Sequence, residues 1–214
     1  MLQKASILVI FLWVFQSCAV QRNSVVPIGY KLVWSDEFEK GTKPNPKFWG
    51  YENGFVRNEE LQWYQSENAN IHDGKLIISG KKESVKNHQY KPESSNWREN
   101  REFAEYTSAS INTNGKFDFQ FGILEVKAKI DTSMGMWPAI WTLGIKKGWP
   151  SNGEIDVMEY YLVDQKPAIL ANAAWKGEKA YVSWDSEKIP FSKFLEKDPK
   201  WADKFHIWKL DWTK

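Results

Sequence analysis

The stretch FGILEVKAKID, residues 121–131, alternates between apolar and charged side chains with a period of two. Its apolar members at positions 124, 126, 128 and 130 share one face of an extended chain, and its charged members at 125, 127 and 129 share the other. Successive side chains of a strand point to opposite faces, so this pattern is typical of a half-buried β-strand. The stretch therefore predicts a strand that covers a core with one face.

Further strand-like segments lie on both sides of this stretch. FHIWKLDW (205–212) alternates in the same way, and GKLIISGKK (74–82) follows a turn-like His-Asp pair. Asn-Gly or Asp-Gly pairs, which are turn signals, occur at 53–54, 73–74 and 114–115. Many short strands separated by turns predict an all-β fold, a two-sheet antiparallel β-sandwich. The best helix candidate is 198–205, and the polar stretches 84–102 and 176–200 read as long loops.

The composition narrows the class of partner. The 214 residues include 29 Lys and Arg against 27 Asp and Glu, which leaves a net charge of only +2. This balance creates no positive field of the kind that gathers nucleic acid, so we expect no nucleic-acid partner. The chain also holds 13 Trp, 8 Tyr and 12 Phe. These side chains either fill the core or present flat apolar faces to sugar rings.

The N-terminus has the features of an export signal. An apolar run from Ile7 to Phe15 follows Lys4; it is too short to span a bilayer and fits a secretory signal. Cys18, the single cysteine of the chain, stands just after it, as in the lipobox of bacterial lipoproteins. We therefore expect a signal peptide over 1–17, lipidation of Cys18 and a tether over 18–28. The protein would be exported and held at a bacterial membrane only through this lipid, in the periplasm or at the cell surface; plain secretion with an incidental cysteine is the alternative.

The stretch WPSNGEIDVMEYY (149–161) places three acids, Glu154, Asp156 and Glu159, in an apolar run. On a regular strand Glu154 and Asp156 share a face, but Glu159 points away. One β-bulge would add a residue and bring all three acids to the same face. Apolar neighbours suggest that the other face is packed, which would place the acids in a cleft. An exposed acidic strand edge or a calcium site is the alternative interpretation.

Three acids on one face suggest a specific chemistry. Two carboxyl groups about 5–5.5 Å apart are the geometry of a retaining glycosidase. A third acid nearby raises the pKa of one of them, because full ionisation is unfavourable. Under this hypothesis Glu154 attacks the anomeric carbon, Asp156 hydrogen-bonds Glu154 and tunes its charge, and Glu159 acts as acid and then as base.

GEIDVMEY, preceded by GMWPAIWTLG (135–144) and YTSASINTNGKFDFQFGILEVKAKI (106–130), resembles glycoside hydrolase family 16 in its laminarinase-like branch. LVWSDEF (32–38) and RNEELQWYQSENANIHDGKLIISGKKE (57–83) resemble it too, so the likeness covers most of residues 30–212. The E-x-D-x-x-E spacing resembles members with a bulged catalytic strand. The resemblance implies a β-jelly roll whose concave sheet forms an open cleft for a polysaccharide.

The resemblance also implies further site residues and a domain boundary. Trp137 and Trp141 would line the cleft, Arg57 and Asn58 would bind sugar hydroxyls, and Trp175 would form another wall. No cofactor is expected for the chemistry, a structural calcium ion is an option without assigned ligands, and the protein is expected to be a monomer. The catalytic domain would span 29–214. It would lack its C-terminal strands, because the family continues past the point where this chain reads KLDWTK.

The sequence leaves the substrate open. The first hypothesis is an endo-acting β-glucanase that cleaves β-1,3 or mixed β-1,3/1,4 linkages with retention. The second keeps the mechanism on a marine galactan such as agarose, porphyran or carrageenan. The third is a glycan-binding lipoprotein without chemistry. Many laminarinases carry a His on the strand after the catalytic one, whereas this chain reads ILANAAW (169–175), so its sugar contacts there would differ.

Overall fold

The computed structural model describes residues 26–214. The predicted signal peptide, Cys18 and most of the predicted tether lie outside the described residues. The chain divides into two compact units, one ending at Ser35 and one running from Asp36 to Lys214. In the first unit, the backbone N–H of Tyr30 closes a turn on the carbonyl of Pro27 at 3.0 Å. The second unit begins at Asp36, and all strands below belong to it; the catalytic domain start at residue 29 stays a prediction.

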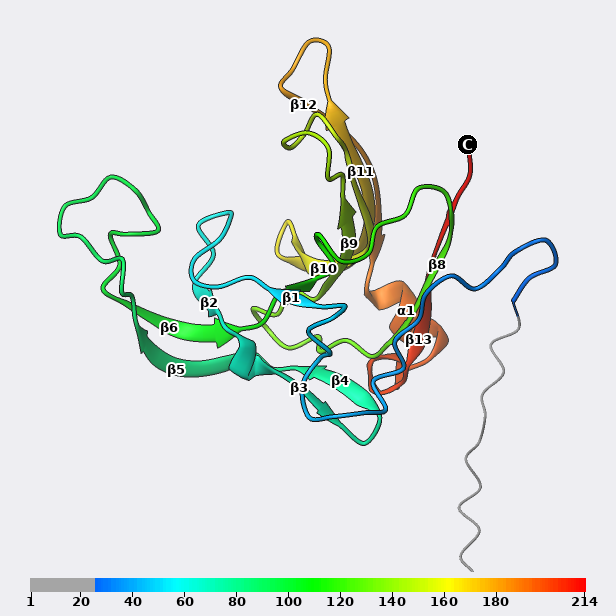
Figure 1. The fold of residues 1–214 in the computed structure, drawn as a ribbon, viewed down its shortest axis with the longest axis horizontal. Coiled ribbons are helices and arrows are strands. Elements are labelled where there is room, and N and C mark those ends of the chain that lie inside the picture. Colours follow the sequence, from blue (N-terminus) through cyan, green and yellow to red (C-terminus); the bar gives the residue numbers. More distant parts are fainter. Residues whose placement is uncertain (1–25) are drawn as a thin grey trace, which may run out of the picture. The chain divides into compact units, whose positions relative to one another are not determined.

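The second unit is built almost entirely from short strands (Figure 1). The strands are β1 Gly50–Tyr51, β2 Gln62–Tyr64, β3 Ala69–His72, β4 Lys75–Ile78, β5 Lys81–Lys86, β6 Phe103–Ser108, β7 Ile111–Asn112, β8 Gly122–Ala128, β9 Ala139–Leu143, β10 Glu154–Val163, β11 Lys166–Lys176, β12 Val182–Pro190 and β13 His206–Trp212. The helical elements are α1 Ser192–Lys197 and the 3-10 turns η1 Ser66–Asn68 and η2 Trp201–Asp203. The all-β prediction is confirmed.

The largest sheet has four antiparallel strands in the order β12-β11-β10-β9. Smaller groups pair β2-β6-β5, β13-β8, β3-β4 and β1-β7. All of these pairs are antiparallel except the short parallel contact between β2 and β6. In Figure 1, β5 and β6 curve away on one side while β10, β11 and β12 rise as a second group of strands.

Strand β8 has the predicted alternation. Leu124 and Val126 are half-buried, whereas Glu125 and Lys127 are exposed. β8 pairs with β13, so that Trp208 lies opposite Val126 and Leu210 lies opposite Leu124. Directly opposed side chains in an antiparallel pair share a face, which extends the apolar face across both strands.

The hydrophobic core lies behind the four-stranded sheet. Its buried members come from the loop after β8, from β10, from β11 and from the start of α1: Ile130, Met158, Tyr160, Ile169 and Phe191. Phe194 and Leu195, three and four residues after Phe191, pack against this core. This spacing is that of one helix face, so α1 is held by its apolar contacts rather than by its length.

The helix prediction for 198–205 is wrong in position, since α1 ends at Lys197. Asp198 is extended, with φ −152° and ψ 100°. A residue that precedes a proline is biased toward this conformation, so Pro199 marks the end of the helix rather than its start. Only the 3-10 turn η2 falls within the predicted range.

The two predicted long loops have different outcomes. Residues 87–102 do connect β5 to β6 without a strand or helix, and buried Asn87 holds the loop by donating to the carbonyls of Arg98 at 2.8 Å and Arg101 at 2.9 Å. The range 176–200 is not a loop, because it contains β12 and α1. β12 was missed because its sequence, VSWDSEKIP, carries polar side chains on both faces.

Candidate active site

A β-bulge in β10 brings the three acids to one face of the sheet. Asp156 lies opposite Asn172 of β11, and Glu159 lies opposite Leu170, so three steps on β10 match two on β11. On the β9 side the register shifts between Asp156 and Met158, which places the extra residue at Val157. The predicted bulge is confirmed. Glu154, Asp156 and Glu159 share a face, while Met158 reaches the core on the opposite side.

Asp156 is the buried centre of the group, with only 3% of its surface exposed. Asn172, itself 8% exposed, donates from Nδ2 to Asp156 Oδ2 at 3.1 Å and to Glu159 Oε2 at 2.6 Å. The carboxyl group of Asp156 also hydrogen-bonds those of Glu154 and Glu159. Asp156 therefore lies between Glu154 and Glu159 and contacts both of their carboxyl groups.

Each glutamate also accepts a hydrogen bond from an indole N–H. Trp149 Nε1 donates to Glu154 Oε2 at 2.6 Å, and Trp137 Nε1 donates to Glu159 Oε1 at 2.8 Å. Trp149 precedes β10 and Trp137 precedes β9, so the two donors come from loops at different ends of the acid group. A donor to a carboxylate stabilises its charged form and fixes its orientation.

The electrostatics of the site favour retention of a proton. Burial, then the nearby charge of Asp156, raises the pKa of Glu154 to about 7. Burial also raises the pKa of Asp156, against the opposing effect of the Asn172 hydrogen bond. For Glu159, burial raises the pKa, the Trp137 hydrogen bond lowers it, and the charge of Asp156 raises it again. The three carboxyl groups are thus unfavourable as a fully ionised set, as expected from their proximity.

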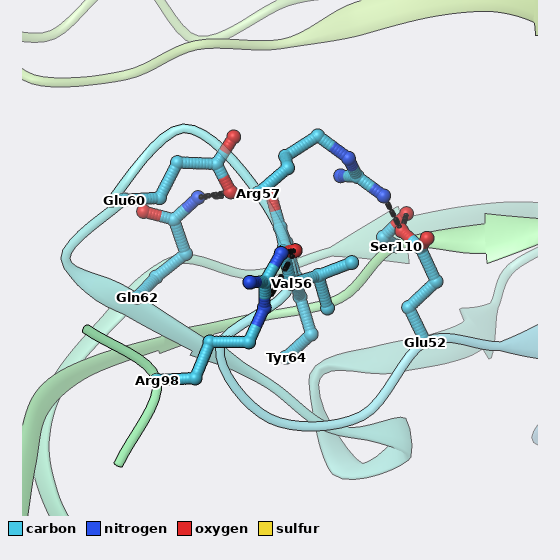
Figure 2. Close-up of polar contacts among 8 residues, drawn as sticks. All are labelled: Glu52, Val56, Arg57, Glu60, Gln62, Tyr64, Arg98 and Ser110. Atoms are coloured by element: carbon cyan, nitrogen blue, oxygen red, sulfur yellow. Dashed lines mark hydrogen bonds and ion pairs between the residues drawn. The ribbon is translucent and has the colours of Figure 1, made fainter. Parts of the chain in front are cut away.

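Trp141 and Arg57 join the site from β9 and from the loop before β2. Trp141 lies directly opposite Asp156, on the same face as the acids. The Arg57 guanidinium lies 5.1 Å from the ring centre of Trp141 and 5.6 Å from that of Tyr64. Figure 2 shows the same guanidinium directed at Glu52, with which it forms an ion pair. Because Glu52 also accepts from Ser110 Oγ at 2.5 Å, Arg57 is fixed beside Trp141.

Asn58 follows Arg57 in the chain and is exposed. Its backbone is left-handed, with φ 55°, a conformation that asparagine tolerates better than most residues. Its side chain hydrogen-bonds Glu60, whose carboxylate also accepts from Tyr64 at 2.8 Å. Figure 2 shows the further contact of Glu60 with Gln62, which donates to it at 3.1 Å. The structure therefore links Asn58 to Glu60, whereas Arg57 reaches Trp141.

The prediction that Trp175 forms a wall beside the acids requires a correction. Ala174 lies opposite Glu154, and Trp175 is the next residue of β11. Since neighbouring side chains of a strand point to opposite faces, Trp175 lies on the face away from the acids. Trp184 of β12 lies opposite Ala174 and therefore occupies the acid face instead.

Three residues of the acid face were missed by sequence reasoning: Trp149, Asn172 and Trp184. Trp149 stands in the same stretch as the acids, and its proximity to Glu154 in the chain was an available signal. Asn172 is a lone amide in the apolar run AILANAAW, and a polar side chain buried in such a run needs a partner. Trp184 carried no local signal, because β12 itself was read as loop.

The described range 26–214 holds no candidate metal cluster and no candidate membrane-spanning helix. Within this range no three or more His, Cys, Asp or Glu side chains are grouped so as to hold a metal ion. The predicted calcium ion stays a prediction. No helix in the same range is long and apolar enough to cross a membrane.

Three acids on one face of an antiparallel sheet, with indole donors on two of them, define a class of carbohydrate-active β-protein. A family model described as the XgeA-like catalytic GH16 domain matches residues 49–174, which is more than half of the 214 residues. The chain therefore belongs to glycoside hydrolase family 16.

Curated and solved relatives agree with this assignment. A beta-glucanase from Rhodothermus marinus is 31% identical over 196 residues, which cover 86% of this chain and 60% of the relative. The laminarinase catalytic domain from Thermotoga maritima superposes with a TM-score of 0.67 at 32% identity, covering 86% of this chain and 70% of that one. This superposition supports the sandwich architecture.

A further solved structure comes from endo-acting O-glycanases that prominent members of the human gut microbiota express to initiate mucin breakdown. It superposes with a TM-score of 0.76 at 33% identity and covers 88% of this chain and 66% of that one. This chain thus spans 60–70% of the length of these three relatives.

Proposed function

We propose that the protein is an endo-acting retaining glycoside hydrolase that cleaves β-1,3- or mixed β-1,3/1,4-glucan by double displacement. The observation that carries the proposal is the bulge at Val157, which places Glu154, Asp156 and Glu159 on one face with Asp156 between the glutamates. Family membership and the similarity to the Rhodothermus beta-glucanase support glucan as the substrate.

In the first step, the carboxylate of Glu154 attacks the anomeric carbon and forms a glycosyl ester, while Glu159 donates its proton to the departing glycosidic oxygen. In the second step, Glu159 takes a proton from water, and the resulting hydroxide displaces Glu154 from the sugar. Glu154 leaves as a carboxylate and Glu159 regains its proton, so the site returns to its starting state.

The surroundings of the acids suit these roles. Burial and the charge of Asp156 raise the pKa of both Glu154 and Glu159, so the coupled acids share a proton. The reaction uses the state in which Glu159 holds this proton and Glu154 is ionised. Asp156 cannot itself reach solvent readily, since it is 3% exposed; it positions Glu154 and Glu159 and adjusts their charge. We assign Trp137 and Trp141 to the sugar beside the cleaved bond. Arg57, held by Glu52 against Trp141, is assigned to its hydroxyls.

The test compares Glu154→Gln and Glu159→Gln with the wild type in release of reducing ends from laminarin and lichenan. Both variants should lose at least a thousandfold in kcat yet unfold cooperatively. Glu187→Gln, an exposed glutamate of β12, is the matched control and should keep full activity. Proton NMR should detect the β-anomer of the new reducing end first. Near wild-type turnover by Glu154→Gln, or the α-anomer as first product, would contradict the proposal.

A second substrate class has a specific observation in its favour. The gut O-glycanase structure superposes with a TM-score of 0.76, which is above the 0.67 of the laminarinase domain. The same mechanism on a mucin O-glycan is therefore an alternative, beside the marine galactans that the sequence left open. Mucin O-glycans, agarose and porphyran belong in the panel, and cleavage of one of these without cleavage of laminarin or lichenan would replace glucan as substrate.

Export and anchoring complete the proposal. Cleavage before Cys18 and its lipidation would hold a monomeric enzyme at the bacterial membrane, in the periplasm or at the cell surface. Expression in a bacterial host followed by detergent partition tests this, because Cys18→Ser should move the protein from the detergent phase to the aqueous phase. A non-catalytic glycan-binding role would be favoured only by tight glucan binding without any reducing-end release.

A further inference from the structure

An aromatic group beside Glu154 is not used by the mechanism above. It consists of Trp149, Tyr181 and Trp184, and we call it the Trp184 group. The Trp149 ring centre lies 6.0 Å from that of Tyr181 and 6.5 Å from that of Trp184. The Trp149 ring plane meets those of Tyr181 and Trp184 at 63° and 49°, so the Trp149 ring stacks flat on neither. Their exposed fractions are 44%, 69% and 48%, which leaves large parts of these aromatic surfaces open to solvent.

The register of the sheet places this group on the acid face. Glu154 lies opposite Ala174, and Ala174 lies opposite Trp184. Since neighbouring strands are about 4.8 Å apart, Trp184 stands on the order of 10 Å from Glu154 across the sheet. Ala174 between them carries only a methyl group. A ligand chain that passes Glu154 therefore meets no bulky side chain from β11 before it reaches Trp184.

Two hydrogen bonds hold the group in place. Tyr181 Oη donates to the backbone carbonyl of Trp149 at 3.0 Å, which ties the start of β12 to the loop before β10. Trp149 in turn donates to Glu154 at 2.6 Å. The group is thus continuous with the acids and combines Trp184 of β12 with Tyr181, just before β12, and Trp149, in the loop before β10, rather than being a chance exposure of one apolar side chain.

We propose that the Trp184 group is a sugar-binding subsite that takes a β-linked glucosyl unit of the substrate away from the cleaved bond. This rests on the proposed function, because the polysaccharide must lie across the acid face. The axial C–H groups of a β-glucosyl ring form apolar faces that match the flat surface of an indole. The Tyr181 hydroxyl donates its proton to Trp149 and would accept from a sugar hydroxyl, and the Trp184 indole N–H would donate to one.

The subsite should act on binding rather than on the chemical step. Trp184 stands two strands from Glu154, so its contacts with sugar are the same before and during bond cleavage. Contacts of this kind lower KM and leave kcat unchanged. A short substrate that does not extend from Glu154 to Trp184 gains nothing from it.

The test uses Trp184→Ala with Trp175→Ala as its matched control. The two tryptophans are 48% and 46% exposed and come from adjacent strands, but they lie on opposite faces of the sheet. Binding of β-1,3-gluco-oligosaccharides of increasing length is measured by calorimetry in the Glu159→Gln background, in which turnover is removed. Trp184→Ala should weaken binding of the longer oligosaccharides about tenfold and leave the shortest unchanged, whereas Trp175→Ala should change neither.

The subsite would be overturned if Trp184→Ala and Trp175→Ala weakened binding equally, or if Trp184→Ala weakened binding equally at every oligosaccharide length. If Trp184→Ala does not unfold cooperatively, Tyr181→Ala replaces it, because its ring is 69% exposed and the same length-dependent loss is expected. The proposed function fails separately. If Trp184→Ala weakens the binding of longer oligosaccharides as expected but the wild type releases no reducing ends, the proposal of hydrolysis is overturned and the subsite is kept.

Discussion

The side-chain amide of Asn172 donates to Glu159 at 2.6 Å from the strand that faces it. The same nitrogen donates to Asp156 at 3.1 Å, so one buried amide serves two carboxylates. Both hydrogen bonds favour the ionised forms and hold the pKa of each acid below the value that burial alone would give. Asn172 is therefore a positioning residue that also sets the pH range in which Glu159 keeps its proton.

Replacing Asn172 by Ala should shift the pH dependence of kcat/KM on the alkaline side. Glu159 acts while protonated, so activity falls as the pH rises through its pKa. Loss of the donor raises this pKa, and the alkaline limb should move up by about one pH unit. Ser186→Ala is the control, since Ser186 lies opposite Asn172 on β12 and is exposed. An alkaline limb that stays in place, or moves down, would exclude this role.

The two indole donors should act on opposite limbs of the same profile. Glu154 attacks as a carboxylate, so activity is lost as the pH falls through its pKa, which the Trp149 hydrogen bond lowers. Trp149→Phe should therefore move the acid limb to higher pH and narrow the profile. Trp137 lowers the pKa of Glu159, so Trp137→Phe should move the alkaline limb to higher pH and widen it. Movement of the same limb in both variants would refute the assignment of nucleophile and acid.

The bulge predicts an asymmetry between two single-residue deletions. Val157 is the extra residue of β10, so its deletion leaves Glu159 on the acid face and Tyr160 in the core. Deletion of Ile155 also returns Glu159 to the acid face, but it places Asp156 directly after Glu154, so the Asp156 carboxyl group turns toward the core and Val157 takes its place among the acids. The first variant should unfold cooperatively with a Tm lowered by several degrees, and the second should show no cooperative transition by circular dichroism. Similar behaviour of the two would mean that the strand is not phased by Val157.

Much of the fold, and the grouping of the three acids, could be predicted from short stretches of the sequence. The period of two in β8 was confirmed, and the spacing of Glu154, Asp156 and Glu159 required the bulge that the register shows. The signal was sufficient because each acid had to avoid the apolar core formed by its own neighbours in the strand. The face of an acid could thus be inferred from a few residues of β10 alone.

The placement of aromatic side chains from other strands could not be inferred in this way. Trp175 and Trp184 differ in face only because β11 pairs with β10 at Glu154 and Ala174, and that register is a contact between distant segments. β12 alternates no apolar face, so neither its existence nor the orientation of Trp184 had a local signal. Residues that depend on register between strands therefore need the structure.

The raised pKa of Glu154 has a consequence for stability. Its pKa is about 7 in the folded protein against an ordinary value of 4.5, mainly because burial disfavours the charge. A group whose pKa is raised on folding contributes stability that is present below the unfolded pKa and is lost as the pH rises through the folded value. The wild type should thus lose stability from Glu154 between about pH 4.5 and about pH 7, while Glu154→Gln, which cannot ionise, should not.

Urea denaturation across this range tests the effect. Near the lower end the wild type and Glu154→Gln should have similar free energies of unfolding. Above the upper end the variant should be more stable by on the order of 1 kcal/mol, a figure reduced for the solvent screening of a half-exposed carboxyl group. Glu187→Gln on β12 should not produce this pH-dependent gain. A variant that is less stable than the wild type at high pH would mean that Glu154 is held as a favourable charge, and its proton could then not be the one shared within the acid group.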